Sequence, residues 1–284
     1  MSKAIILQNV EHEGPGRIVP VFRDFGIPTE VRRLYSGDEV PSPQGPGLEE
    51  IRLLVVLGGP MGVSDVGSAS YPFLAPTLEL LKVMVARDRP VLGICLGAQL
   101  LAAAGGARVY RNVKPSPPPP PAKEGEPPPP PPPPPEPLPE FGWHPVTFPF
   151  PGGTEPIVMG LVDGTPMFHW HFDTFDLPKL PAPPNPPPGP PPPTGSVLLS
   201  SSKLCRNQAF RFKTKLFGFQ YHFEFTPDDI ERVVAADRAT AVQVLGEDGV
   251  ARIAEETKKH YARHERAGNK ILTNLVQFLK SYQG

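Results

Sequence analysis

Residues 91–100 read Val91-Leu-Gly-Ile-Cys95-Leu-Gly-Ala-Gln-Leu100, with a cysteine between an apolar run and a run of small residues. Residues 90–94 predict a short buried strand and residues 97–104 a tightly packed helix, so Cys95 is predicted on a strand-to-helix turn. There the helix dipole and the free backbone N–H groups lower a cysteine pKa. The pattern indicates a nucleophile, with a small buried hydrophobe as the alternative.

A second segment supplies possible partners for this cysteine. Residues 217–225 read Phe217-Gly-Phe-Gln-Tyr-His222-Phe-Glu224-Phe225 and predict a strand, whose period of two places His222 and Glu224 on one face. Cysteine hydrolases need an imidazole near the thiol, and they gain from a third group that fixes the imidazole tautomer. The sequence therefore contains candidates for all three members of a catalytic triad.

A glycine turn, Gly58-Gly59-Pro60-Met61-Gly62, follows the strand predicted over residues 51–57. Such a turn leaves backbone N–H groups free to stabilise a developing oxyanion. We expect the N–H groups of Gly59 and Leu96 to form this oxyanion hole. A tight turn without a chemical role is the alternative.

Taken together and in this order, with His171-Phe-Asp173 between them, these motifs closely resemble the class I glutamine amidotransferases. The likeness is to the free-standing branch related to the amidotransferase domain of GMP synthetase, and it covers about residues 5–226 outside the proline tracts. The resemblance implies that Cys95 is the nucleophile, that His222 is the base and that Glu224 is the carboxylate that orients the base. It also implies three residues that bind the amino-acid end of the substrate, namely Gln99, His171 and Asp173.

The resemblance implies cleavage of the γ-glutamyl amide of glutamine through a cysteine thioester, which releases glutamate and ammonia and needs no cofactor. No phosphate-binding loop for ATP is found in the sequence, so ammonia would pass to a separate synthetase. A γ-glutamyl peptide hydrolase that acts alone is one alternative. A non-catalytic interaction protein that displays polyproline is another.

The order of the predicted elements favours a doubly wound α/β fold with a mostly parallel sheet and helices on both faces. Strands are predicted over 4–8, 29–34, 51–57 and 90–94, and helices over 16–25, 76–86 and 97–104. After residue 111 shorter extended pieces follow, at 143–148, 167–170, 197–199, 208–212 and 216–223. This flavodoxin-like amidotransferase domain is expected to span residues 1–226.

C-terminal helices over residues 227–284 are expected to pack on the same domain. The first is predicted to begin at Pro227 with Thr226 as its N-cap, and a longer one to follow Gly249. The longer helix carries one apolar stripe. The stripe packs on the domain or, as the alternative, forms an interface with a partner.

Two proline-rich inserts depart from the family pattern, over residues 115–139 and 178–193. They hold 17 and 11 of the 44 prolines, and proline excludes both from interior helices and central strands. Low-complexity inserts are the simplest interpretation. Docking to aromatic-groove modules and a lid over the active-site edge are the alternatives.

Composition limits the remaining classes of function. The formal net charge is −1, with 28 basic and 29 acidic residues, so we expect binding neither to nucleic acid nor to an anionic membrane. The two cysteines are too few for a disulfide framework. With no leader pattern and no apolar run near 20 residues, a soluble cytoplasmic protein is expected.

The segment Phe168-His169-Trp-His171-Phe-Asp173 could instead form a metal site, because His169, His171 and Asp173 occupy every second position and would lie on one face of a strand. No Glu-x-x-His or Cys-x-x-Cys pattern completes a ligand set, so no metal is expected here.

Overall fold

The computed structural model describes residues 2–114, 134–181 and 195–281, so most of the two proline-rich inserts lies outside the described residues. The α-helices of the described residues are α1 (Ile18–Asp24), α2 (Leu74–Ala86), α3 (Leu96–Ala104), α4 (Pro227–Ala236) and α5 (Arg238–Ser281). The strands are β1 (Lys3–Gln8), β2 (Thr29–Arg33), β3 (Ile51–Val56), β4 (Val91–Ile94), β5 (Val109–Arg111), β6 (Glu140–Thr147), β7 (Thr165–His171), β8 (Asp173–Phe175), β9 (Ser196–Ser202), β10 (Ala209–Phe212) and β11 (Leu216–Phe219).

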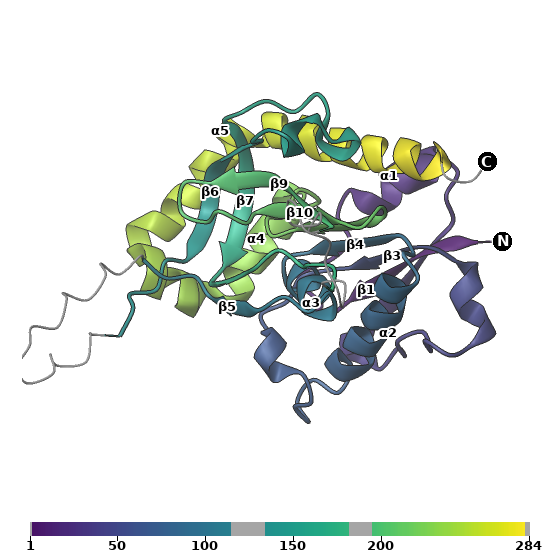
Figure 1. Cartoon of the computed structure of the whole chain (residues 1–284). Coiled ribbons are helices and arrows are strands. Elements are labelled where there is room, and N and C mark those ends of the chain that lie inside the picture. The colour runs from purple at the N-terminus through teal and green to yellow at the C-terminus, as the bar shows by residue number, and fades with distance from the viewer. Residues whose placement is uncertain (1, 115–133, 182–194, 282–284) are drawn as a thin grey trace, which may run out of the picture.

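A nine-stranded sheet lies at the centre of the described chain, in the order β2-β1-β3-β4-β11-β10-β9-β6-β7 (Figure 1). The strands from β2 to β11 run parallel to their neighbours. From β11 onward each pair is antiparallel. A small second sheet pairs β5 with β8. The predicted α/β fold, with a parallel first half and a mixed second half, is confirmed.

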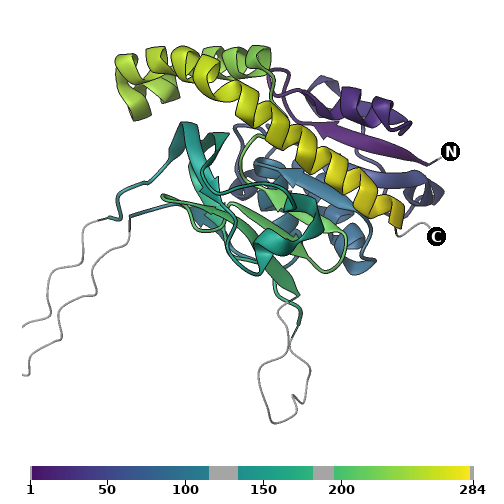
Figure 2. The ribbon, with the colours of Figure 1, turned by 90° about the horizontal axis from the view of Figure 1, so that it is seen from above.

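Helices cover both faces of the sheet. On one face α2 and α3 contribute Leu81 and Leu100 to a buried core. On the other face α1 and α5 contribute Phe22 and Leu272, and Figure 2 shows α5 running across the sheet alongside α1. Burial of each such side chain contributes roughly 1.5–3 kcal/mol, so the apolar faces of these helices hold the layers together.

The carboxyl ends of the parallel strands meet at one edge of the sheet, where ligands gather in folds of this type. β1, β3, β4 and β11 all end there. The segments that follow these four strands carry Glu13, Gly59, Cys95 and His222. The fold therefore brings together residues that lie more than 200 positions apart in the sequence.

The strand predicted to carry His222 and Glu224 ends earlier than expected. β11 stops at Phe219, which pairs with Ile94, the last residue of β4. Because β4 turns into α3 at that point, β11 loses its parallel neighbour and cannot continue as a strand. His222 instead forms an isolated bridge, in which its backbone N–H donates to the carbonyl of Phe168 at 2.9 Å.

The C-terminal helices also differ in part from the prediction. The cap of α4 is confirmed, since the Thr226 hydroxyl accepts from the backbone N–H of Asp229 at 3.3 Å. The range of α5 begins at Arg238, but its helical path is interrupted at Gly246, where φ is 71°, so the predicted longer helix begins just after Gly246 rather than after Gly249. Gly249 is a buried residue inside the helix, so its glycine does not mark a boundary.

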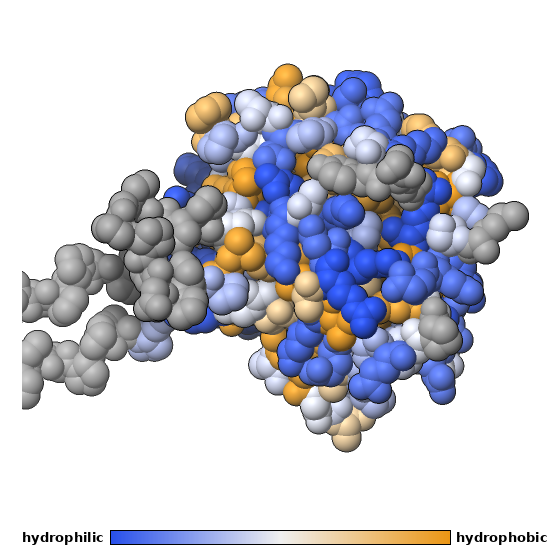
Figure 3. Space-filling view, turned by 45° about the vertical axis from the view of Figure 1, so that its right-hand side comes forward, coloured by the Kyte–Doolittle hydropathy of each residue, from blue (hydrophilic) through white to orange (hydrophobic). Residues whose placement is uncertain are grey.

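The face of the molecule in Figure 3 is largely hydrophilic, with hydrophobic residues scattered between the polar ones. Within residues 2–114, 134–181 and 195–281, none of the helices combines the length and the apolar character needed to cross a membrane.

Candidate active site

Cys95 lies on the turn between β4 and α3, as the sequence predicts. Its backbone has φ 52° and ψ −111°, a region that L-residues rarely adopt. The turn is held close to β3, because a Cβ atom on Gly97 would lie 2.0 Å from the carbonyl oxygen of Val56. The local sequence thus presents the thiol at the end of the strand, and Leu96 begins the helix behind it.

The thiol of Cys95 is almost fully enclosed, with 5% of the residue exposed. It donates to the backbone carbonyl of Trp170 at 3.8 Å and accepts from Nε2 of Gln220 at 3.6 Å. Burial raises the pKa of Cys95, and the charge and hydrogen bond of His222 oppose that rise. The helix N-terminus is expected to lower the pKa of Cys95, but burial of the thiol outweighs this effect. Formation of the thiolate therefore depends on the positive charge of His222.

His222 and Glu224 meet as predicted, although they do not share a strand. Nδ1 of His222 lies 2.7 Å from Oε1 of Glu224, and each residue is 1% exposed. Burial alone would lower the pKa of His222, but the charges of Glu224 and Cys95 and hydrogen bonds to both raise it well above its ordinary value. The ring also stacks on Phe225 at 4.0 Å between centroids. The imidazole is therefore fixed in orientation and favours its protonated form.

A pocket of about 350 Å³ opens beside Cys95. Five predicted site residues line it, namely Gly59, Cys95, Gln99, His171 and Asp173. Gln99 donates to Oε1 of Gln220 at 3.2 Å, which ties it to the residue that contacts the thiol. Asp173 lies 3.5 Å from the guanidinium of Arg111. The other three predicted residues, Leu96, His222 and Glu224, are buried next to Cys95 and do not line the cavity.

Glu13 is a pocket residue that the sequence analysis did not identify. It lies between β1 and α1, is 5% exposed, and places Oε2 4.0 Å from Nε2 of His222. Burial raises its pKa to about 7, with the negative charges of Glu224 and Asp237 adding to the rise and His222 opposing it. Its place after a parallel strand, like that of Gly59 and Cys95, is the signal that could have found it.

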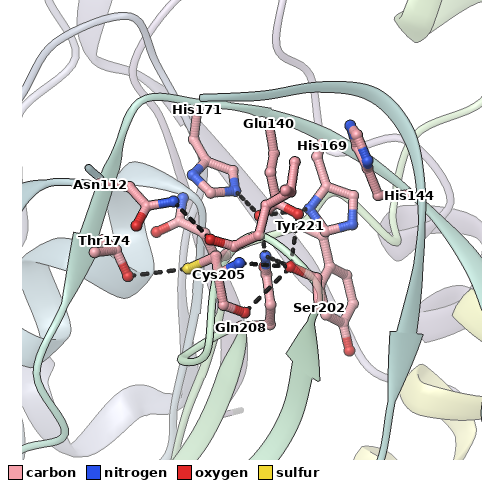
Figure 4. Close-up of polar contacts among 12 residues, drawn as sticks. Asn112, Glu140, His144, His169, His171, Thr174, Ser202, Cys205, Gln208 and Tyr221 are labelled. Atoms are coloured by element: carbon pink, nitrogen blue, oxygen red, sulfur yellow. Dashed lines mark hydrogen bonds and ion pairs between the residues drawn. The ribbon is translucent and has the colours of Figure 1, made fainter. Parts of the chain in front are cut away.

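Behind the pocket lies a buried polar cluster of Glu140, His169 and His171, whose possible ligand atoms all lie within 4.8 Å of one another. Figure 4 shows the two imidazoles on either side of the carboxylate, whose Oε2 lies 3.2 Å from Nε2 of His171. Cross-strand pairing of Glu140 with His171 explains the arrangement. These three residues could hold a metal ion. Asp173, the third member of the set considered from the sequence, follows the end of β7 and is not among them.

The carboxylate of Glu140 also has partners within the chain. Its Oε1 accepts from the hydroxyl of Ser202 at 2.6 Å, and its Oε2 accepts from the amide of Gln208. Burial would raise the pKa of Glu140, but the hydrogen bond to His171 and the charges of both histidines lower it to about 2. The cluster thus joins β6 and β7 to β9 and to the segment before β10.

Comparisons with known proteins support the same interpretation of the site as its geometry does. The family model described as glutamine amidotransferase class-I matches residues 16–241. YfeJ of Salmonella typhimurium, a protein described as glutamine amidotransferase-like, is 25% identical over 251 residues, which cover 88% of this chain and 87% of YfeJ.

Solved structures show the same likeness. A glutamine amidotransferase from Thermotoga maritima has a TM-score of 0.71 and 25% identity, with 97% of this chain and 98% of that chain covered. A Thermoplasma acidophilum protein described as a GMP synthase subunit shares the fold, with a TM-score of 0.57, 20% identity, and 100% and 96% of the two chains covered. With its family model spanning most of the sequence, this chain belongs to the class I glutamine amidotransferases.

Proposed function

We propose that this chain hydrolyses the γ-glutamyl amide of glutamine through a thioester on Cys95, releasing glutamate and ammonia. The observation that carries the proposal is the contact of Cys95, which lies on its strained turn and lines the pocket, with the buried imidazole of His222, whose Nδ1 is held by Glu224. Membership of the class I family supports the reaction class.

The reaction begins when the Cys95 sulfur attacks the amide carbon of the substrate. The backbone N–H groups of Gly59 and Leu96 stabilise the oxyanion; Leu96 is the first residue of α3, and such an N–H has no acceptor within its own helix. The C–N bond then breaks as protonated His222 gives its proton to the nitrogen, which leaves as ammonia. Water attacks the thioester, His222 takes one of its protons, and glutamate leaves as the thiol is restored.

Three further pocket residues have a role in this proposal. Gln99, His171 and Asp173 bind the α-amino and α-carboxylate groups of the substrate. Residues 1–226 form the catalytic domain, and the C-terminal helices α4 and α5 pack on it and contribute Val233, Asp237 and Thr240 to the pocket. Ammonia passes to a synthetase on a separate polypeptide, a relationship for which the fold shared with a protein described as a GMP synthase subunit gives the precedent.

The test is glutamate release from glutamine and from a panel of γ-glutamyl dipeptides. Cys95→Ala should abolish release. Cys205→Ala is the matched control, because Cys205 is buried away from the pocket, 3.1 Å from the hydroxyl of Thr174, and should retain activity.

The substrate that is cleaved decides between the remaining possibilities. Release from glutamine supports the proposal, whereas release from dipeptides alone indicates a γ-glutamyl peptide hydrolase. Release that survives Cys95→Ala would contradict the assigned nucleophile. Absence of release from every compound, with and without candidate synthetases, would favour a non-catalytic role.

A further inference from the structure

Glu13 places a second carboxylate at the reacting end of the pocket. Its Oε2 is buried and has no hydrogen-bond partner among the described residues, although the side chain lines the same cavity as Cys95. A buried carboxylate oxygen without a partner is costly, so such an atom indicates a group that arrives with the substrate.

Gly58 shows how closely the reacting groups converge. A Cβ atom added to it would lie 2.1 Å from Oε2 of Glu13, 2.8 Å from Cε1 of His222 and 3.3 Å from Cβ of Cys95. The Nδ1 side of His222 is occupied by Glu224, and Glu13 lies on the opposite side, 4.0 Å from Nε2. The carboxylate of Glu13 therefore faces the atom that gives its proton to the departing nitrogen.

We infer that Glu13 forms a subsite for the leaving group, which selects against leaving groups that carry a carboxylate. This inference rests on the proposed function. A proton donor must lie within about 3 Å of the nitrogen it protonates, so that nitrogen is within reach of Glu13 as well. A primary amide offers two N–H groups, one of which can donate to Oε2. An amino-acid leaving group brings a carboxylate two bonds from its nitrogen, and like charges at this distance repel strongly away from water.

The other charged groups of the pocket do not reverse this selection. Asp65 and Asp237 add negative charge to the lining, and Asp237 accepts from the indole of Trp170 at 3.0 Å. The charge of Arg111 is offset by Asp173, and the charge of protonated His222 is offset by Glu224, whose Oε1 lies 2.7 Å from its Nδ1. His12 also lines the pocket, and burial lowers its pKa, which favours the neutral ring. Glutamine and γ-glutamyl amines without a carboxylate are therefore the favoured class of substrate.

The first test compares hydrolysis of γ-glutamyl methylamide with hydrolysis of γ-glutamylglycine, whose leaving amines differ by one carboxylate. It is run at pH 8, above the pKa of Glu13, which burial raises to about 7. The native enzyme should favour the methylamide in kcat/KM by at least about tenfold. Glu13→Gln should reduce this preference by about tenfold, chiefly by faster cleavage of γ-glutamylglycine. Glu11→Gln is the matched control. It removes the same charge from a residue that is exposed and lies outside the pocket. An unchanged preference in Glu13→Gln would overturn the inference.

The second test needs no turnover. Alkylation of Cys95 by neutral iodoacetamide and by anionic iodoacetate is followed at pH 8 by peptide mass spectrometry, which separates Cys95 from Cys205. Glu13→Gln should raise the iodoacetate rate relative to the iodoacetamide rate several-fold, and Glu11→Gln should not. A ratio that stays constant in Glu13→Gln overturns the subsite.

The two tests keep the inference and the proposed function apart. A changed alkylation ratio without any γ-glutamyl hydrolysis would support the charge of the subsite and contradict the proposed function. Hydrolysis with both ratios unchanged in Glu13→Gln would support the function and contradict the subsite.

Discussion

Nδ1 of His222 lies 2.7 Å from Oε1 of Glu224, in a place from which water is almost entirely excluded. The two residues leave the sheet together after β11, so their contact is fixed by a short irregular segment rather than by a strand. Because the carboxylate occupies Nδ1, the ring presents Nε2 toward Cys95 and Glu13. The geometry assigns the two ring nitrogens different tasks.

Glu224→Gln should lower kcat for glutamine by about 10⁴-fold, the loss seen when the orienting carboxylate of a triad becomes an amide. The charge of Glu224 raises the pKa of His222, so its loss lets the imidazole give up its proton at lower pH. The alkaline limit of the remaining activity should therefore move to lower pH. A kcat–pH profile for both proteins checks this, and an unshifted profile would argue against the assigned role.

Gly97→Ala should destabilise the protein by several kcal/mol or prevent folding. An added Cβ would lie 2.0 Å from the carbonyl oxygen of Val56, and that carbonyl belongs to the central strand β3. Gly47→Ala is the matched control, because nothing lies within 4 Å of its added Cβ. Urea unfolding of both variants measures the difference. Equal stabilities would mean that α3 can move away from β3 at little cost.

The parts of the site that could be predicted from the sequence are those set by local pattern. An apolar run, a cysteine and small residues define the turn at Cys95, because each element is encoded by its own residues. The spacing of His222 and Glu224 predicts their contact correctly for the wrong reason. β11 ends where its neighbour β4 ends, and a single segment carries no information on the length of its neighbour.

The parts that could not be predicted depend on pairing between distant segments. Glu140 joins His169 and His171 only because the register of β6 on β7 places it opposite His171. Glu13 reaches His222 only because β1 and β11 both end at the same edge of the sheet. Both carboxylates are unremarkable in the sequence, since Glu is usually a solvent-exposed residue.

Cys95→Gly should be more stable than Cys95→Ala by about 1 kcal/mol, although both lack the thiol. An L-residue at φ 52° and ψ −111° carries strain of about 1–3 kcal/mol, whereas glycine adds roughly 0.5–1 kcal/mol of backbone entropy to the unfolded chain. At Cys205, where φ is not positive, the order should reverse. Chemical denaturation of the four variants checks both signs, and a more stable alanine at residue 95 would contradict stored strain at the turn.

Glu13→Gln should stabilise the protein, and the gain should depend on pH. The pKa of Glu13 is raised from 4.5 to about 7 in the folded protein, so between these values the folded chain holds a proton that the unfolded chain has lost. The native protein should therefore lose stability as pH rises from about 4.5 to 7, by on the order of 3 kcal/mol, and change little from this source above pH 7. Glutamine does not titrate, so the difference in unfolding free energy between variant and native protein should grow across this window.

Denaturant titrations of both proteins at pH 5, 6, 7 and 8 measure this difference. Glu11→Gln removes an exposed carboxylate from the same loop, and its difference from the native protein should stay nearly constant with pH. A constant difference for Glu13→Gln as well would mean that the carboxylate finds a partner or solvent in the folded chain. It would then also weaken the case for a leaving-group subsite, because that case depends on an oxygen left without a partner until substrate arrives.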